Sequence, residues 1–304
     1  MRRPITDIGR GEALAGAAIV LTVALFVVEL RFLNEWGSGI HLAYLGIASL
    51  AILAIALGEP SEGDPSPTLS VLYVTSFLLA LRALYHLAEV LGADNGLNQW
   101  ETLTWVGAVL TLLGGFLAWT RRSAVMMLFA AVAFGVMVES AYEWVVDPQG
   151  PEGLRWILMA LIAIYAVGIL LIRDERPRHA IALADAAGLA LVVLAISLIG
   201  DSTGPIFGLV LGQAQLSGIP GGWEIAQLLG GGLLVAYGIY ERAPGPAYFG
   251  GYSLVAFTVL ARVGEEVSML WWPVILLVVA LIAAAYEFSP ARAASGEPSG
   301  SAPT

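Results

Sequence analysis

Long apolar stretches, separated by short polar turns, follow one another through almost the whole chain. Each has about the 20 mostly apolar residues that a helix needs to cross the hydrocarbon core of a membrane. We count ten stretches, and they predict spans at Ala13–Leu33, His41–Leu57, Leu69–Leu91, Glu101–Thr120, Ser123–Val146, Leu154–Arg173, His179–Gly200, Trp223–Tyr240, Ala247–Glu266 and Met269–Glu287. The predicted fold class is therefore an all-α integral membrane protein, a polytopic bundle of about ten transmembrane helices.

The breaks between stretches carry residues that end helices, such as Gly58-Glu59-Pro60 and Pro244-Gly245-Pro246. No break is long enough for a soluble domain. We therefore expect a single transmembrane helical domain over residues 1–288 and a disordered cytoplasmic tail over residues 289–304. The longest break, residues 201–222, contains a short apolar segment that would either lie flat on the outer interface or dip into the membrane.

Composition agrees with the pattern: 58% of the residues are hydrophobic and 12% are charged, against about 25% charged in soluble domains. The expected partner is therefore the lipid bilayer. The net charge of −10 argues against nucleic acid. Cysteine and lysine are both absent, which excludes disulfides, zinc-thiolate sites and Schiff-base chemistry on lysine.

The 14 arginines predict the orientation, because basic residues concentrate on the cytoplasmic side. With the N-terminus inside, ten arginines fall inside and four outside, and eight of the nine tryptophans fall near the outer boundary. On that model 13 acids face four arginines outside, so −9 of the net charge lies there. We expect a multi-pass protein of a bacterial-type plasma membrane with both termini in the cytoplasm.

The cytoplasmic turns resemble one another weakly. Leu112-Leu113-Gly114-Gly115 precedes Arg121-Arg122, much as Leu228-Leu229-Gly230-Gly231 precedes Glu241-Arg242. The echoes suggest repeated helical hairpins, although short matches of leucine, alanine and glycine also arise by chance. Glycines within the spans suggest close helix packing, with a hinge as the alternative.

Ionisable residues lie within the outer halves of several predicted spans. Arg82, His86 and Glu89 are spaced four and three residues apart, so they share one helix face. Charges inside membrane segments usually face the bundle interior and mark pathways or proton relays. The candidate polar site consists of Glu29, Arg82, His86, Glu89, Glu139, Arg262 and Glu265. We expect Arg82 to pair with an acid of another span, Glu139 or Glu29; the alternative is that these groups are local ion pairs that reach the interface.

Asp185 is the one acid that lies well inside a span toward the cytoplasmic side. Its neighbours are Ala184, Ala186 and Gly188, which allow another helix to approach closely. With no basic residue nearby in the span, its carboxyl group is a candidate for proton coupling. The alternative is a structural carboxyl at a helix contact.

Motifs for other chemistry are missing. The chain has three histidines, and a haem between His41 and His86 would need them at the same depth, which their positions do not predict. We therefore expect no metal and no cofactor. The leading functional hypothesis is a transporter or permease for a small solute or cation, with an acidic outer vestibule. The alternatives are a membrane-embedded enzyme acting on an outer-leaflet or lipid-linked substrate, with His86 and Glu89 or Glu139 as acid–base groups, and a non-catalytic scaffold or sensor.

Overall fold

The computed structural model describes residues 5–33, 35–59, 65–93, 99–147, 152–200 and 221–263, and these residues form helices joined by turns. The helices are α1 (Ile5–Arg31), α2 (Ser38–Gly58), α3 (Pro67–Val90), α4 (Trp100–Arg121), α5 (Ala124–Val146), α6 (Glu152–Ile172), α7 (Pro177–Gly200), α9 (Gly221–Tyr240) and α10 (Pro244–Val263). They coincide with the first nine predicted spans. The predicted tenth span, the tail and most of the 201–222 loop lie outside the described residues.

Seven of these helices, α1 to α7, are long and apolar enough to cross a membrane. Their outward faces are apolar as well: Leu112, Leu171 and Leu233 are each more than 70% exposed in the isolated chain. Such surfaces are compatible with lipid and not with water. The chain is therefore a multi-pass helical membrane protein.

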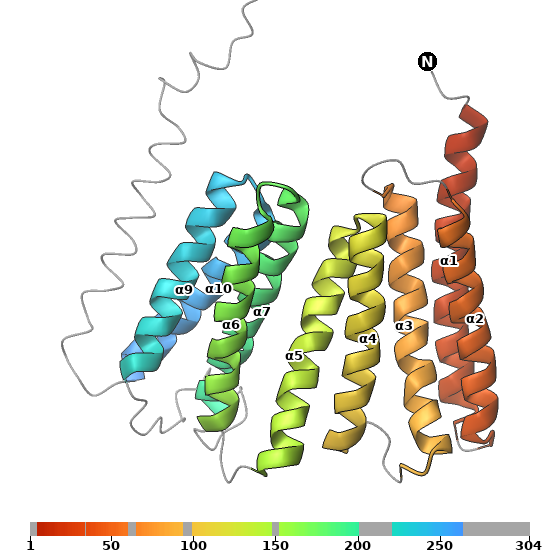
Figure 1. Cartoon of the computed structure of the whole chain (residues 1–304), viewed down its shortest axis with the longest axis horizontal. Helices are drawn as coiled ribbons and strands as arrows, with labels where there is room; N and C mark the ends of the chain where they lie inside the picture. Colours follow the sequence, from red (N-terminus) through yellow and green to blue (C-terminus); the bar gives the residue numbers. More distant parts are fainter. Residues whose placement is uncertain are drawn as a thin grey trace, which may run out of the picture.

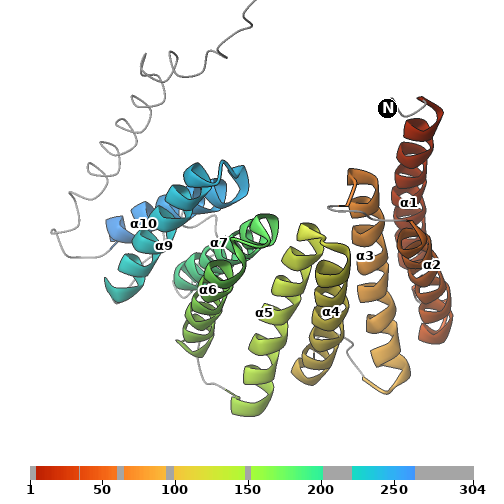
Figure 2. The same ribbon diagram turned by 45° about the horizontal axis from the view of Figure 1, so that its top comes forward.

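The helices pack as neighbouring antiparallel pairs, α2 with α3, α4 with α5, α6 with α7 and α9 with α10. Figure 1 shows these pairs side by side in a row, and Figure 2 shows that the row curves. Contacts of α3 with α4, of α5 with α7 and of α7 with α10 join the pairs, and α1 packs against α3. The paired arrangement is the one that repeated hairpins would produce, while the internal duplication itself stays a prediction.

Small residues allow the paired helices to approach closely. An ideal Cβ added to Gly114 of α4 would lie 3.1 Å from the Cβ of Ala130 in α5. An ideal Cβ on Gly231 of α9 would lie 3.0 Å from the carbonyl oxygen of Gly250 in α10. The adjacent Gly115 has open space around it. These contacts support the close-packing interpretation of the glycines.

Turn residues determine where the helices begin and end. Pro67 opens α3 after Ser66, whose hydroxyl accepts a hydrogen bond from the Leu69 amide at 3.3 Å. The arginines after α4 and α9 both adopt the left-handed conformation, with φ of 52° at Arg122 and 54° at Arg242. These are the two turns that resemble each other in sequence. Together with the α6–α7 turn, they lie along the same edge of the row, where these helices end or begin (Figure 1). We call this edge the arginine-rich end.

Buried polar side chains also join the helices. Gln227 of α9 is fully buried; its amide donates to the Leu191 carbonyl of α7 at 2.9 Å and accepts from the Ser253 hydroxyl of α10 at 2.5 Å. Ser49 of α2 and Ser76 of α3 each donate to the other's backbone carbonyl, at 2.9 and 3.0 Å. Such hydrogen bonds fix the register between helices in the absence of a hydrophobic driving force.

Candidate functional site

Four predicted site residues form one network between α1 and α3, which we call the Glu29 tetrad: Glu29, Arg82, His86 and Glu89. Glu29 is 1% exposed and accepts hydrogen bonds from the Arg82 guanidinium. His86 is equally buried and lies between two carboxylates, with Nε2 2.9 Å from Glu29 and Nδ1 2.8 Å from Glu89. The tetrad thus links a buried carboxylate of α1 to a half-buried carboxylate near the end of α3.

The two contacts of His86 determine how many protons the titratable groups share. An ionised carboxylate only accepts hydrogen bonds, and a neutral imidazole has one N–H and one bare nitrogen. Each N···O contact needs one proton between its atoms, so Glu29, His86 and Glu89 hold two protons on these contacts. With the Arg82 guanidinium, the tetrad then has no net charge. A neutral network is the arrangement that membrane burial favours, because an uncompensated charge there is costly.

Aromatic side chains surround the tetrad. Tyr85 packs under the Arg82 guanidinium, 4.7 Å from ring centroid to Cζ. His41 of α2 stacks on His86 with centroids 4.8 Å apart, and its Nδ1 lies 2.9 Å from the Tyr44 hydroxyl. Trp36, in the α1–α2 turn, contacts both His41 and Tyr44. The sequence-based expectation that the two histidines lie at different depths is therefore wrong: α2 and α3 pack antiparallel and bring both rings to one level.

The remaining candidates of the outer site do not join this network. Arg82 pairs with Glu29, one of the two acids predicted for it. The other, Glu139 of α5, is partly buried, has the like-charged Glu143 as its electrostatic neighbour, and makes no hydrogen bond or ion pair with any described residue. Arg262 lies in α10 with its side chain outside the described set, and Glu265 lies beyond the described residues. A common cavity lined by all the outer candidates therefore stays a prediction.

Asp185 lies in the half of α7 that is nearer the arginine-rich end. An added Cβ on Gly245, in the first turn of α10, would overlap its carboxyl group. The Oδ1 atom is buried, and it has no hydrogen-bond partner within the described part of the chain. The nearby Tyr237 hydroxyl of α9 is also buried without a described partner. The predicted close approach of another helix is thus present, and the positive end of the α10 dipole faces the carboxylate.

Sequence reasoning did not identify His41 and Tyr44 as neighbours of the site. Both belong to the α2 face that contacts α3, and only the helix pairing reveals that contact.

In the described part of the chain no group of three or more His, Cys, Asp or Glu side chains is arranged to hold a metal ion. Comparison with family models, with curated proteins and with solved structures finds no match to this chain. The argument for function therefore rests on the site itself.

Proposed function

We propose that the protein is a permease of the plasma membrane that moves a small solute or cation, and that the Glu29 tetrad is its proton relay. The observation that carries this proposal is the placement of His86, which bridges two carboxylates of very different exposure. Glu89 has a side chain 27% exposed, whereas the side chains of His86 and Glu29 are 1% and 2% exposed. The tetrad thus offers a path for a proton from the surface to a buried acid.

The relay conserves the two protons that the contacts require. In the starting state one proton is on Glu89 and lies between its carboxyl oxygen and Nδ1 of His86, and the other is on Nε2 and lies toward Glu29. As the proton on Glu89 passes to Nδ1, the proton on Nε2 passes to Glu29, so Glu89 ends ionised and Glu29 ends neutral. Neutral Glu29 then no longer compensates Arg82, whose side chain is 31% exposed. This change weakens the link between α1 and α3 and provides a means of coupling protonation to helix movement.

The wider proposal places the tetrad on the extracytoplasmic side, by the arginine distribution, and both termini in the cytoplasm. The proposal also includes ten membrane spans, an acidic vestibule on the outer side and Asp185 as the proton-coupling group of the inner half. An acidic outer surface would raise the local concentration of cations, which favours a cationic solute.

Proton entry into vesicles tests the proposal. The full chain is reconstituted into liposomes that contain a pH-sensitive dye, and an inward proton gradient opposes a gradient of Na⁺ or choline. Vesicles with the wild-type chain should acidify faster than protein-free vesicles, and Glu29→Gln should lower the excess rate by about tenfold or more, as loss of an essential proton carrier does.

Glu35→Gln is the matched control, because Glu35 is an exposed carboxylate near the same end of α1. It should acidify at the wild-type rate. The proposal is wrong if wild-type vesicles acidify no faster than protein-free vesicles, or if Glu29→Gln, shown to be folded by its thermal unfolding, acidifies like the wild type.

A further inference from the structure

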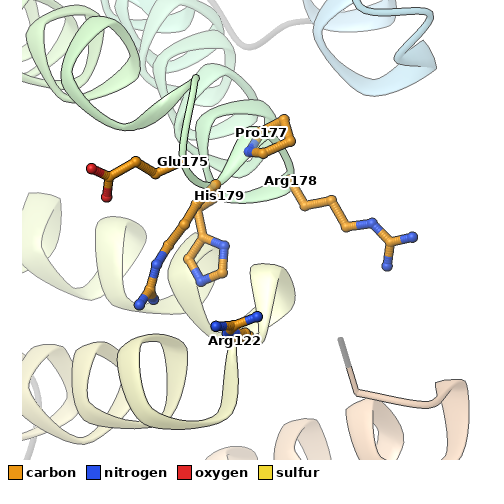
Figure 3. Close-up of a pocket in the computed structure, with 6 residues that line it drawn as sticks. Arg122, Glu175, Pro177, Arg178 and His179 are labelled. Carbon is orange, nitrogen blue, oxygen red and sulfur yellow. The ribbon is translucent and has the colours of Figure 1, made fainter. Parts of the chain in front are cut away.

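A basic pocket of about 440 Å³ opens at the arginine-rich end, between the α4–α5 and α6–α7 turns. Its lining residues are Arg122, Glu175, Arg176, Pro177, Arg178 and His179. Figure 3 shows Arg122 and His179 close together, while Glu175 and Arg178 extend to opposite sides. The centre of the pocket therefore lies between the two helix pairs and is flanked by basic side chains.

The basic groups on the α6–α7 side are held in place by the last turn of α4. Arg176 donates a hydrogen bond to the Trp119 carbonyl at 3.1 Å, and its guanidinium lies 4.0 Å from the Trp119 ring centroid. His179 is 2% exposed, and its Nε2 lies 2.9 Å from the Ala118 carbonyl, to which it donates. A preorganised site of this kind loses little side-chain entropy when a ligand binds.

Arg122 is the least expected element of the pocket. It adopts φ of 52°, a left-handed conformation that costs a residue with a Cβ about 1–2 kcal/mol. Glycine is the usual residue at such a helix end. The Arg122 side chain is exposed and makes no hydrogen bond or ion pair with the described residues. Within the described part of the chain, its guanidinium is therefore available to bind a ligand beside the other basic groups of the pocket.

We propose that this pocket binds the phosphate group of an anionic ligand, either a lipid headgroup or free phosphate. Arg122 and Arg176 supply guanidinium groups, which pair with phosphate oxygens in bidentate geometry. The first turn of α7 begins at Pro177, and the positive end of its helix dipole also favours an anion. Glu175 is the one acid in the lining, and it points away from Arg122 in Figure 3. Basic pockets between membrane helices are known sites for anionic headgroups.

Thermal unfolding of the purified full chain tests the site and separates the two ligand sources. One arm compares sodium phosphate with sodium chloride at equal ionic strength. The other compares micelles doped with short-chain phosphatidylglycerol or with phosphatidylcholine, which carries phosphate but no net charge. A rise of the unfolding midpoint with phosphate supports a free-phosphate site, and a rise with phosphatidylglycerol alone supports a headgroup site.

Arg122→Gln and Arg242→Gln form the matched pair. Both arginines follow a helix end at nearly the same left-handed φ, but Arg242 does not line the pocket. Arg122→Gln should weaken the apparent affinity for the stabilising ligand about tenfold, as expected for a lost charge-assisted hydrogen bond, and Arg242→Gln should match the wild type. The proposal fails if no ligand shifts the wild-type midpoint more than its control does, or if Arg122→Gln responds like the wild type.

Discussion

The imidazole rings of His41 and His86 stack between α2 and α3, with centroids 4.8 Å apart and planes 20° apart. The two histidines have different surroundings. His86 contacts a carboxylate at each nitrogen. His41 contacts the Tyr44 hydroxyl at Nδ1, and its Nε2 is buried without a hydrogen-bond partner among the described residues. His86 therefore belongs to an ionic network with two carboxylates, whereas His41 has one hydrogen-bonded nitrogen and one buried nitrogen without a described partner.

This difference predicts opposite effects for the same substitution at the two positions. Phenylalanine keeps the stacked ring but removes both nitrogens. His86→Phe should lower the free energy of unfolding by about 3–5 kcal/mol, because it removes one partner of a buried ionic network. His41→Phe should leave stability unchanged or raise it slightly, because removal of the unpaired buried nitrogen offsets the loss of the single hydrogen bond to the Tyr44 hydroxyl. Denaturant unfolding in micelles measures both, and equal losses would contradict the different roles assigned to the two rings.

The pairing of Arg82 with Glu29 predicts a strong coupling between two residues that are 53 positions apart. Arg82→Gln alone should cost about 3 kcal/mol, because it leaves the buried Glu29 carboxylate with a single partner. Once Glu29→Gln has removed that carboxylate, Arg82→Gln should cost much less. A double-mutant cycle on unfolding free energies gives the interaction. Additive losses would show that the contact contributes nothing, and Arg31→Gln, at an exposed position of α1, provides the baseline.

Much of the secondary structure could be predicted from the sequence, because in a membrane the apolar length defines the helix. The residues that begin and end the helices could also be recognised in the sequence. Pro67 and Pro177 open α3 and α7 close to the predicted starts of those spans, and Asp147 ends α5 in a left-handed conformation. The ionisable stripe on α3 also followed from the spacing of Arg82, His86 and Glu89.

The choice of partners across helices could not be predicted in this way. Glu29 and Glu139 were equally plausible acids for Arg82, and only the packing of α1 against α3 decides between them. Arg155 illustrates the same limit: it lies in the first turn of α6, where an arginine can usually reach water, but it is 6% exposed and donates to the Ser197 carbonyl of α7. Arg122 and Arg176 served only as markers of orientation in the sequence, because their convergence depends on two turns that meet in space.

Adjacent glycines give a matched test of helix packing in this chain. Gly114→Ala should lower the free energy of unfolding by about 1–3 kcal/mol, because the new methyl group meets the α5 backbone at Ala130. Gly115→Ala, one residue away, faces open space and should stabilise α4 by about 0.5–1 kcal/mol. Thermal unfolding of the two variants measures the difference. Equal midpoints would show that α4 and α5 do not pack in this register.

Substitution of Gln227 should also lower the free energy of unfolding, but by less than Gly114→Ala does. Gln227→Leu should cost about 1 kcal/mol, since it removes hydrogen bonds to α7 and α10 while keeping an apolar side chain of similar size. Thr258→Val is the control, because the Thr258 hydroxyl is exposed and donates only within α10. Unfolding free energies of the two variants should differ by most of that amount. No difference would mean that the amide does not join the helices.

Asp185 provides the last prediction, because its contact with Gly245 separates a structural role from a functional one. Gly245→Ala places a methyl group against the carboxylate and should lower the free energy of unfolding by about 1–3 kcal/mol. The same substitution in an Asp185→Ala background should cost little, because the obstructing carboxyl group is gone. Gly232→Ala, which faces open space, is the control for helix propensity.

Asp185→Asn then tests the carboxyl chemistry with the volume preserved. If Asp185 couples protons, this variant should unfold like the wild type but lose most of the proton entry into vesicles, because an amide cannot ionise. If Asp185 only compensates the positive end of α10, the variant should lose about 0.3–1 kcal/mol of stability and acidify vesicles at the wild-type rate. Gly245→Ala and Asp185→Asn together therefore distinguish a packing contact, a helix-end charge and a proton carrier by stability and flux measured on the same purified variants.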